Sequence, residues 1–279
     1  MVEIGKYINA NGINTHYHEA GQGEPLLLIH GSGPGASAWA NWRLAFPALS
    51  EQFHLYAPDV VGFGTTERRE GQDYSIDVWV NHMIDFIEAI GEKKVSIIGN
   101  SFGGAIALHL VYRRPDLVNR VVLMGSVGNQ STLSAGLDAV WGYTPSFDNM
   151  KNLIKIFSYD QSNAANDNLV EMRYQASIQE GFQEAFSSMF PAPRQRHLDA
   201  MALTDEQLKS IEKSVLLIHG REDEVIPLEE TSWEIARLIP NAELHVFPHC
   251  GHWVQIEKTE EFIAQVIGFL KRTKAVNAV

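Results

Sequence analysis

The fold is decided by residues 94–108, which read Lys94-Val-Ser-Ile-Ile-Gly99-Asn-Ser101-Phe102-Gly103-Gly-Ala-Ile-Ala-Leu108. A β-branched apolar run leads into Gly-x-Ser-x-Gly, and a small-residue helical pattern follows, so the stretch predicts a strand, a sharp turn and a helix. The two glycines allow the strand and the helix to approach closely. The turn places the Ser101 hydroxyl at a helix N-terminus, where the Phe102 N–H and the helix dipole favour negative charge. The pattern therefore indicates a nucleophilic serine rather than a purely structural turn.

Strand and helix patterns alternate on both sides of this stretch. Asn11-Gly12, inside residues 4–19, predicts a hairpin. Further strands are expected at 26–29, 54–57, 121–124, 215–218 and 243–247, and further helices at 37–49, 77–90, 228–238 and 259–272. Such alternation predicts right-handed βαβ units, and hence an α/β fold with a mostly parallel central sheet flanked by helices.

Residues 132–205 interrupt this alternation. They carry helical periods without an obvious buried strand, and Pro145, Pro191 and Pro193 divide them into pieces. We therefore predict a core of residues 1–131 and 206–279 with an inserted helical cap of residues 132–205. The alternative is that these helices are part of the same domain.

Composition argues against several kinds of partner and location. The chain has 279 residues and a net charge of −12 without a basic run, which argues against nucleic acid and anionic membranes. No apolar stretch approaches the roughly 18–20 residues of a membrane helix. Residues 1–6 lack the pattern of a signal peptide. The single cysteine, Cys250, cannot form an internal disulfide, so we expect a cytoplasmic protein.

Two later loops supply the base and the orienting acid that a nucleophilic serine needs. Asp223 follows the strand expected at 215–218, and His252 follows the strand expected at 243–247. In a parallel sheet both loops lie at the carboxyl edge, beside Ser101. A serine, an acid and a histidine in this chain order resemble the α/β hydrolases.

Neighbouring residues compete for both roles. Glu222 and Glu224 flank Asp223, and we prefer Asp223 because the Gly-x-x-Asp-x-x-Ile-Pro spacing matches the acid loop of those hydrolases. His249 competes with His252, which follows a glycine and stands where those hydrolases have their base. The tertiary structure has to decide both choices.

Other polar residues are expected to be structural. Cys250 does not lie in a strand–turn–helix elbow, so we expect it to be a packing residue. Asp59 is expected to brace the loop after its strand, and His30 to shape the glycine loop at 31–35. That loop has no following Gly-Lys-[Ser/Thr], so it gives little support to phosphate binding. No cluster has metal-ligand spacing, and we expect no metal.

Two backbone N–H groups are expected to stabilise an oxyanion. The first is that of Phe102, directly after the serine. The second comes from the loop after the third strand, from Gly31 or Ser32, and we prefer Ser32.

Six stretches extend the resemblance over nearly the whole chain. They are His30–Arg43, Gly99–Gly104, Ala139–Pro145, Arg173–Ile178, Phe190–Arg196 and His249–Trp253. They look like the meta-cleavage product hydrolases, which are α/β hydrolases of bacterial aromatic degradation. Within that family the sequence is most similar to the branch that acts on ring-opened monocyclic compounds.

The resemblance implies a function. The substrate would be a 2-hydroxy-6-oxo-hexa-2,4-dienoate with hydrogen, methyl or a short alkyl group at C6, and hydrolysis of its carbon–carbon bond would give 2-hydroxypenta-2,4-dienoate and a small carboxylic acid. No cofactor is implied, the partner is the small-molecule substrate, and we expect a homo-oligomer, a dimer or larger. The family pattern assigns substrate contacts to Asn41, Asn100, Arg173 and Trp253.

Arg173 is the most informative of these residues. Leu169, Arg173 and Ala176 share one helical face, so the arginine interrupts a face that should point inward. The alternative is an arginine paired with a nearby acid, Glu171 or Asp167.

Two other functions compete with this interpretation. A carboxylesterase or lactonase of the same fold would use the same triad without a buried arginine for a substrate carboxylate. A ligand receptor on a hydrolase fold could keep the triad without catalysing a reaction.

Overall fold

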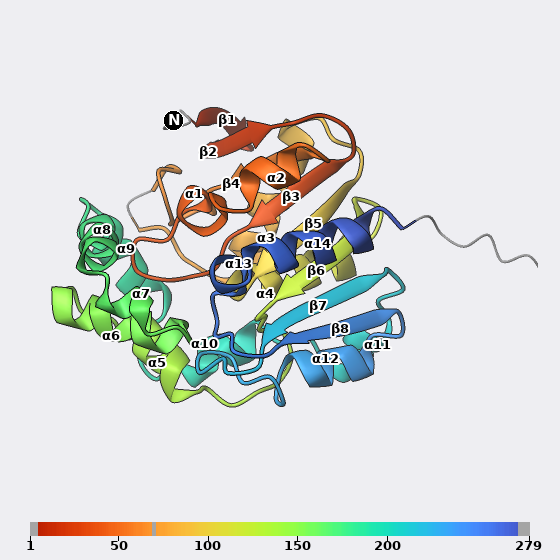
Figure 1. Cartoon of the computed structure of the whole chain (residues 1–279). Helices are drawn as coiled ribbons and strands as arrows, with labels where there is room; N and C mark the ends of the chain where they lie inside the picture. Colours follow the sequence, from red (N-terminus) through yellow and green to blue (C-terminus); the bar gives the residue numbers. More distant parts are fainter. Residues whose placement is uncertain (1–4, 69–70, 273–279) are drawn as a thin grey trace, which may run out of the picture.

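The computed structural model describes residues 5–68 and 71–272. Residue 4 of the predicted hairpin, residues 1–4 of the stretch inspected for a signal peptide, and residues 273–279 of the predicted core lie outside the described residues. The described chain contains an eight-stranded sheet in the order β1-β2-β4-β3-β5-β6-β7-β8 (Figure 1).

The sheet is mostly parallel, as predicted. β1 (Lys6–Ala10) and β2 (Ile13–Ala20) form the hairpin, and β2 pairs antiparallel with β4 (His54–Pro58). The remaining neighbours pair in parallel. Their strands are β3 (Pro25–Ile29), β5 (Val95–Asn100), β6 (Val118–Met124), β7 (Val215–Gly220) and β8 (Ala242–Phe247).

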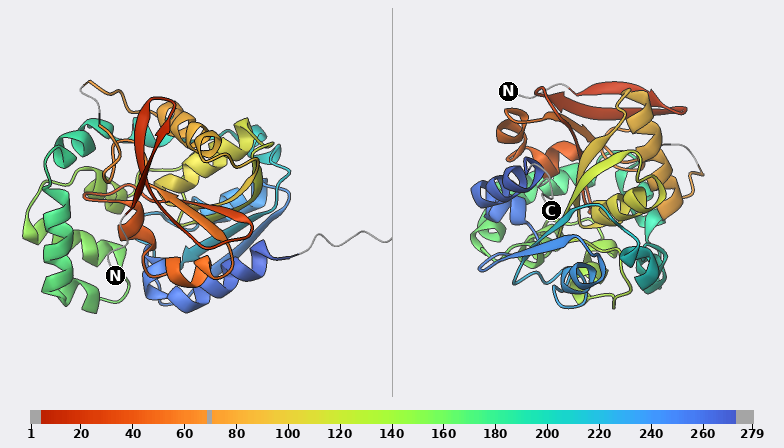
Figure 2. Two further views of the ribbon diagram at one scale, coloured as in Figure 1. Left: turned by 90° about the horizontal axis from the view of Figure 1, so that it is seen from above. Right: turned by 90° about the vertical axis from the view of Figure 1, so that its right-hand side faces the viewer.

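Helices cover both faces of the sheet because the central strands are apolar on both sides. In β3, Leu27 and Ile29 pack toward one face, whereas Leu26 and Leu28 pack toward the other. The first face carries α3 (Ile76–Ala89), α4 (Phe102–Arg113) and α12 (Ser232–Leu238). The second carries α1 (Ala38–Trp42), α2 (Phe46–Ser50), α13 (Val254–Glu257) and α14 (Thr259–Leu270), and Figure 2 shows the two layers.

The chain between β6 and β7 is helical. It contains α5 (Ala135–Trp141), α6 (Phe147–Phe157), α7 (Ser162–Ala165), α8 (Asp167–Ser177), α9 (Phe182–Met189), α10 (Gln195–Ala200) and α11 (Asp205–Lys209). Residues 132–205 are all described and contain no strand, which agrees with the sequence. Figure 1 shows α5 to α9 gathered at one end of the sheet. We propose that residues 132–205 form the cap; α11 contacts α12, so we place it with the core.

Two helix predictions were wrong in their bounds. Residues 37–49 form α1 and α2 instead of one helix, because Pro47 lies in the first turn of a new helix and cannot supply a hydrogen-bonding N–H in the middle of an old one. Residues 228–231 are not helical, and α12 begins at Ser232. There the Thr231 hydroxyl donates to the Pro227 carbonyl and stabilises a turn.

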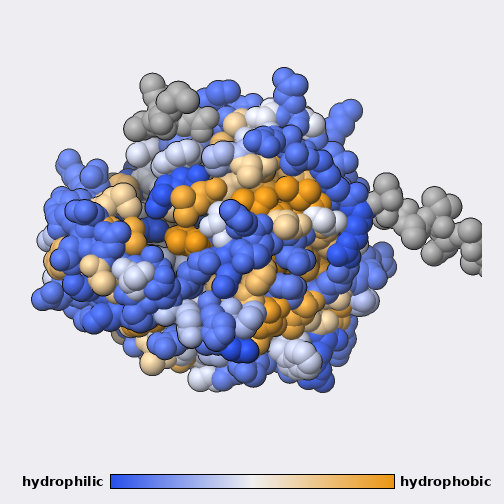
Figure 3. Space-filling model, viewed as in Figure 1, coloured by the Kyte–Doolittle hydropathy of each residue, from blue (hydrophilic) through white to orange (hydrophobic). Residues whose placement is uncertain are grey.

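The surface is apolar in one region of the face shown in Figure 3. Hydrophilic residues cover most of the helices inserted between β6 and β7, whereas apolar residues gather near α2 and α14. None of the described helices combines the length and apolar character needed to cross a membrane.

Candidate active site

Ser101 occupies the turn between β5 and α4. Its backbone has φ 53° and ψ −116°, a strained conformation for a residue other than glycine. The Ser101 N–H donates to the Met124 carbonyl at 2.8 Å, which fixes the turn against β6. A Cβ on Gly103 would lie 2.5 Å from the carbonyl oxygens of Ile29 and His30, so this position requires glycine. The predicted elbow is therefore confirmed, together with the close approach of strand and helix.

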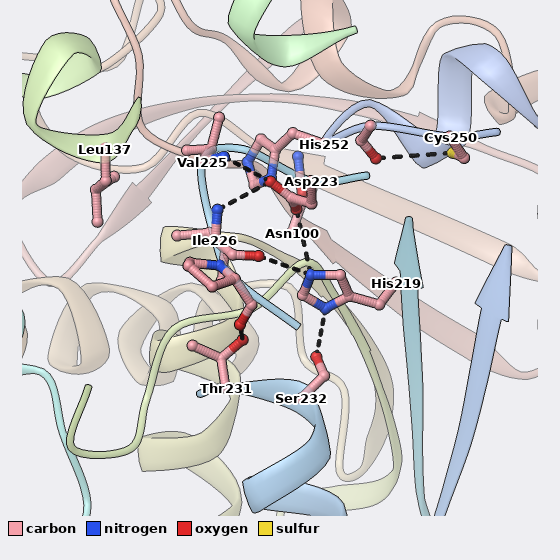
Figure 4. Close-up of polar contacts among 12 residues, drawn as sticks. Asn100, Leu137, His219, Asp223, Val225, Ile226, Thr231, Ser232, Cys250 and His252 are labelled. Atoms are coloured by element: carbon pink, nitrogen blue, oxygen red, sulfur yellow. Dashed lines mark hydrogen bonds and ion pairs between the residues drawn. The ribbon is translucent and has the colours of Figure 1, made fainter. Parts of the chain in front are cut away.

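Asp223 is the carboxylate that pairs with the candidate base. Its Oδ2 accepts a hydrogen bond from His252 Nδ1 at 2.7 Å, and its Oδ1 accepts the N–H groups of Val225 and Ile226 at 2.8 Å each (Figure 4). Burial acts to raise the pKa of the Asp223 carboxyl, but the His252 and His219 imidazoles outweigh it and hold that pKa well below its usual value. Asp223 is therefore ionised at neutral pH.

His252 is held in one tautomer by this contact. A carboxylate only accepts, so His252 Nδ1 carries the proton and Nε2 is the available acceptor. Ser101 and His252 line the same cavity. Among the described residues no hydrogen bond joins the Ser101 hydroxyl to His252, and such bonds commonly tighten only when substrate binds.

The competing residues have other partners. Glu222 accepts the Cys250 N–H at 3.0 Å and an Arg221 hydrogen bond, and Glu224 is exposed. His249 is exposed and contacts the Tyr159 hydroxyl at 3.1 Å. The structure thus brings Asp223 and His252 together, and neither glutamate nor His249 takes their place.

Cys250 is a packing residue, as predicted. It is fully buried in the apolar cluster on the α14 side of the sheet. Burial raises the pKa of its thiol to about 12, so the thiolate is scarce at neutral pH.

Asp59 and His30 brace loops, as predicted. Asp59 accepts the N–H groups of Ala38 and Thr65 at 2.7 and 2.9 Å. His30 Nε2 accepts the Val60 N–H at 3.0 Å, so its Nδ1 donates to the Gly31 carbonyl at 2.8 Å. Both residues are fully buried. His30 holds the glycine loop beside Ser101, and Asp59 holds the loop after β4 against the start of α1.

Gly31 and Ser32, the two candidates for the second oxyanion donor, differ in their contacts. The Gly31 N–H is directed at Asn41 Oδ1 at 3.4 Å. Ser32 lines the cavity beside Ser101, and its Oγ accepts a hydrogen bond from Trp141 Nε1 of α5 at 3.0 Å. This geometry favours Ser32 over Gly31 as an oxyanion donor.

Four of the residues that line the cavity carry buried polar atoms without hydrogen-bond partners. They are Asn41 Nδ2, Asn100 Oδ1, Arg173 Nε and Gln255 Oε1. An unpaired buried polar atom costs roughly 1–3 kcal/mol, so a group of them lining one cavity indicates a polar ligand.

Arg173 has no acidic partner among the described residues. Asp167 pairs with Lys151 at 2.8 Å, and Glu171 accepts a hydrogen bond from Gln175 at 2.9 Å, so the alternative pairing is wrong. The guanidinium lies 5.0 Å above the Trp253 ring. Burial, followed by the charge of Arg43, lowers the pKa of Arg173 to about 10, which leaves it cationic at neutral pH.

Three residues at this site were missed from the sequence. His219 lies 3.4 Å from Asp223 Oδ2 and contacts the Ile226 carbonyl and the Ser232 hydroxyl at 2.8 and 2.7 Å (Figure 4). Gln255 and Trp141 are the other two. His219 directly precedes the acid loop and Gln255 follows His252 by three residues, so proximity in the sequence was a usable signal for these two. The signal for Trp141 was its place in the stretch Ala139–Pro145, which resembles the family.

Comparison with known proteins defines the class. The family model for the alpha/beta hydrolase fold matches residues 24–259. The chain belongs to that family, in agreement with the sheet, the elbow and the acid and histidine loops.

Comparison with individual proteins narrows the class. The chain is 51% identical to 2-hydroxy-6-oxo-2,4-heptadienoate hydrolase of Pseudomonas putida F1, over 96% of each chain. It is 50% identical to 2-hydroxymuconate semialdehyde hydrolase of Pseudomonas sp. CF600, over 98% of this chain and 96% of the relative. A solved structure of the meta-cleavage product hydrolase CumD of Pseudomonas fluorescens IP01, a serine-to-alanine mutant complexed with acetates, superposes with a TM-score of 0.94 at 52% identity, over 97% of this chain and 98% of that one. Within the α/β hydrolases, the chain belongs to the meta-cleavage product hydrolases.

Proposed function

We propose that this enzyme hydrolyses the carbon–carbon bond next to the C6 carbonyl of a 2-hydroxy-6-oxo-hexa-2,4-dienoate that carries hydrogen, methyl or a short alkyl group at C6. Water is consumed, and the products are 2-hydroxypenta-2,4-dienoate and a small carboxylic acid. The observation that carries the proposal is the unpaired, cationic Arg173 in the cavity that also contains Ser101 and His252. A simple ester would not need a buried cation in this cavity.

The polar groups that line the cavity suit the C1 carboxylate and the 2-oxygen of the substrate. Arg173 offers a planar fork of donors, which matches a carboxylate. Asn41 Nδ2 offers a further donor, and Asn100 lies beside it, since its own Nδ2 donates to Asn41 Oδ1 at 2.8 Å. Trp253 lines the same cavity and would pack on the planar diene.

His252 would move the protons. The dienol must first become a ketone, so that the breaking bond has an electron sink. A neutral imidazole whose Nε2 is free can accept a proton and later return it. Ser101, or a water molecule activated by His252, then attacks the C6 carbonyl.

The N–H groups of Phe102 and Ser32 would hold the resulting oxyanion. Both belong to backbone that is fixed before substrate arrives, Phe102 at the start of α4 and Ser32 in the braced glycine loop. Removing one preorganised donor of this kind typically costs ~10²–10³ in rate.

The colour of the dienolate provides the test of function. The purified protein should bleach the yellow dienolate rapidly and hydrolyse nitrophenyl esters far more slowly. Faster ester hydrolysis would favour a carboxylesterase or lactonase. Binding without turnover of either compound would favour a receptor.

Arg173→Ala should lower kcat/KM for the dienoate by an amount that corresponds to ~2–4 kcal/mol of transition-state stabilisation, because a charge-assisted contact in a closed pocket is lost. If the guanidinium also polarises the 2-oxygen while the ketone forms, kcat should fall and KM should rise. Arg173→Lys should restore only part of the lost kcat/KM, since an ammonium group cannot reproduce the planar pair of donors of a guanidinium. Steady-state kinetics with the dienoate and with a neutral ester lacking the carboxylate measure this. Equal losses on the two substrates would mean that Arg173 only braces the cap.

Small C6 groups should be preferred over phenyl. Large side chains of α6, Met150 and Phe157, line the cavity together with Trp253 and restrict its width. The two named relatives act, by their names, on a heptadienoate and on a semialdehyde, which have methyl and hydrogen at this position. The ratio of kcat/KM for the methyl and phenyl substrates measures the preference, and a ratio in favour of phenyl would reject it.

We also propose that the protein works in the cytoplasm as a homo-oligomer. Its one cysteine is buried and unpaired, which suits a reducing compartment. Sedimentation velocity of the purified protein tests self-association.

A further inference from the structure

The loop that carries His252 packs along a segment of the proposed cap. Residues 157–160 leave α6 and run beside residues 249–253. The Trp253 N–H donates to the Phe157 carbonyl at 3.2 Å. A Cβ on Gly251 would lie 2.7 Å from the Phe157 oxygen and 2.8 Å from the Tyr159 nitrogen, so the two backbones are in direct contact.

The Phe157 side chain extends this contact to the base itself. Its ring stacks on Trp253 with centroids 4.9 Å apart at 14°, and on His252 with centroids 5.9 Å apart at 23°. The imidazole therefore has a cap side chain against one of its faces. Any shift of residues 157–160 would change what supports the base.

Glu257 joins the two segments with a single carboxylate. Its Oε2 accepts the Gly251 N–H at 2.7 Å, and its Oε1 accepts the Asp160 N–H at 2.7 Å. Glu257 is half-buried at the end of α13, a helix that starts directly after Trp253. Because the two oxygens belong to one rigid planar group, the spacing between the two amides is fixed.

We propose that Glu257 is a positioning residue that clamps the cap segment 157–160 to the His252 loop, so that the seating of the cap sets the position of the base. The inference rests on the proposed function, in which His252 moves the protons. Glu257 lines no part of the cavity and acts through the loop. Base alignment and cap position are then coupled, because one carboxylate holds both.

Glu222 provides a matched control within the same loop. It accepts the neighbouring amide, that of Cys250, at 3.0 Å, and its other oxygen pairs with Arg221. It thus holds the loop without contacting residues 157–160. Glutamine at position 222 can still accept the one amide with its carbonyl oxygen. Glutamine at position 257 has a single acceptor oxygen for two amides.

The experiment compares Glu257→Gln with Glu222→Gln in dienoate kinetics. Misplacing a catalytic group by about 1 Å costs up to roughly 10² in rate, so Glu257→Gln should lower kcat about tenfold or more. Substrate binding, measured as Kd in a Ser101→Ala background, should stay unchanged. Glu222→Gln should keep nearly the wild-type kcat. In a double-mutant cycle, Glu257→Gln and Phe157→Leu should be non-additive, since both act through the cap segment.

Three outcomes would overturn the inference: a wild-type kcat for Glu257→Gln, an equal loss for Glu222→Gln, or a loss that appears in Kd instead of kcat. If Glu257→Gln does not fold, Glu257→Asp replaces it, because it keeps both acceptor oxygens but withdraws them by one methylene. An intermediate loss of kcat with unchanged Kd then supports the clamp, and a wild-type kcat rejects it.

Failure of the proposed function would be visible separately. Wild-type protein that does not turn over the dienoate would reject the substrate and leave the clamp open to test. The same variants would then be compared in nitrophenyl ester hydrolysis, which requires the same base.

Discussion

The Ser101→Ala variant is expected to lose carbon–carbon bond cleavage while it still folds and binds substrate. Ser101 sits 4% exposed at the elbow, and its backbone is fixed by a hydrogen bond to Met124 and by the tight packing of Gly103. The described structure gives its hydroxyl no hydrogen bond that folding needs. Removing the nucleophile or activator of a triad lowers kcat by on the order of 10⁴- to 10⁶-fold.

Three measurements on one sample of the Ser101→Ala protein test this prediction. Circular dichroism and thermal unfolding report the fold, single-turnover bleaching of the dienolate reports cleavage, and the absorbance change on mixing reports binding. A correctly folded Ser101→Ala protein with near-wild-type turnover would remove Ser101 from the mechanism.

The Asp223→Asn variant is expected to lose about 10⁴ in turnover, as serine hydrolases do when the triad acid becomes an amide. Asparagine has one carbonyl oxygen, whereas Asp223 uses one oxygen for Val225 and Ile226 and the other for His252. If the amide N–H₂ faces His252, the imidazole is driven into the wrong tautomer, with its proton on Nε2.

Glu222→Gln and Glu224→Gln are the controls for this prediction. Neither residue contacts His252, so both variants should keep most of the activity, measured as kcat with the dienoate. A larger loss in either glutamate variant than in Asp223→Asn would show that the wrong carboxylate was assigned.

Some features of this protein could be predicted from its sequence because they depend on neighbouring residues. The elbow at Ser101 depends on the glycines two positions before and after it, and β5 forms because its own residues are largely β-branched and apolar. The acid and histidine loops follow the last two strands, so parallel pairing alone places them at one edge. The two helix bounds that were predicted wrongly also depend on local signals, a proline in the first turn of α2 and a Thr231 hydroxyl that donates to the carbonyl of Pro227.

Only the tertiary structure decided which groups meet. Three acids stand in a row at 222–224. The spacing favoured Asp223, but only the folded structure shows that its side chain, and neither glutamate, meets His252, 29 residues away. Arg173 shares α8 with two acids, Asp167 and Glu171, yet each has another partner, and the guanidinium lines the cavity.

The contacts of Glu257 could not have been predicted from the sequence. It joins amides at 160 and 251, the first of them 97 residues away, and no local pattern marks it as more than a helix-end glutamate. Sequence patterns report the conformation of each segment because backbone preferences are local. Which donors a carboxylate finds depends on how segments pack, and that is settled only when the whole chain has folded.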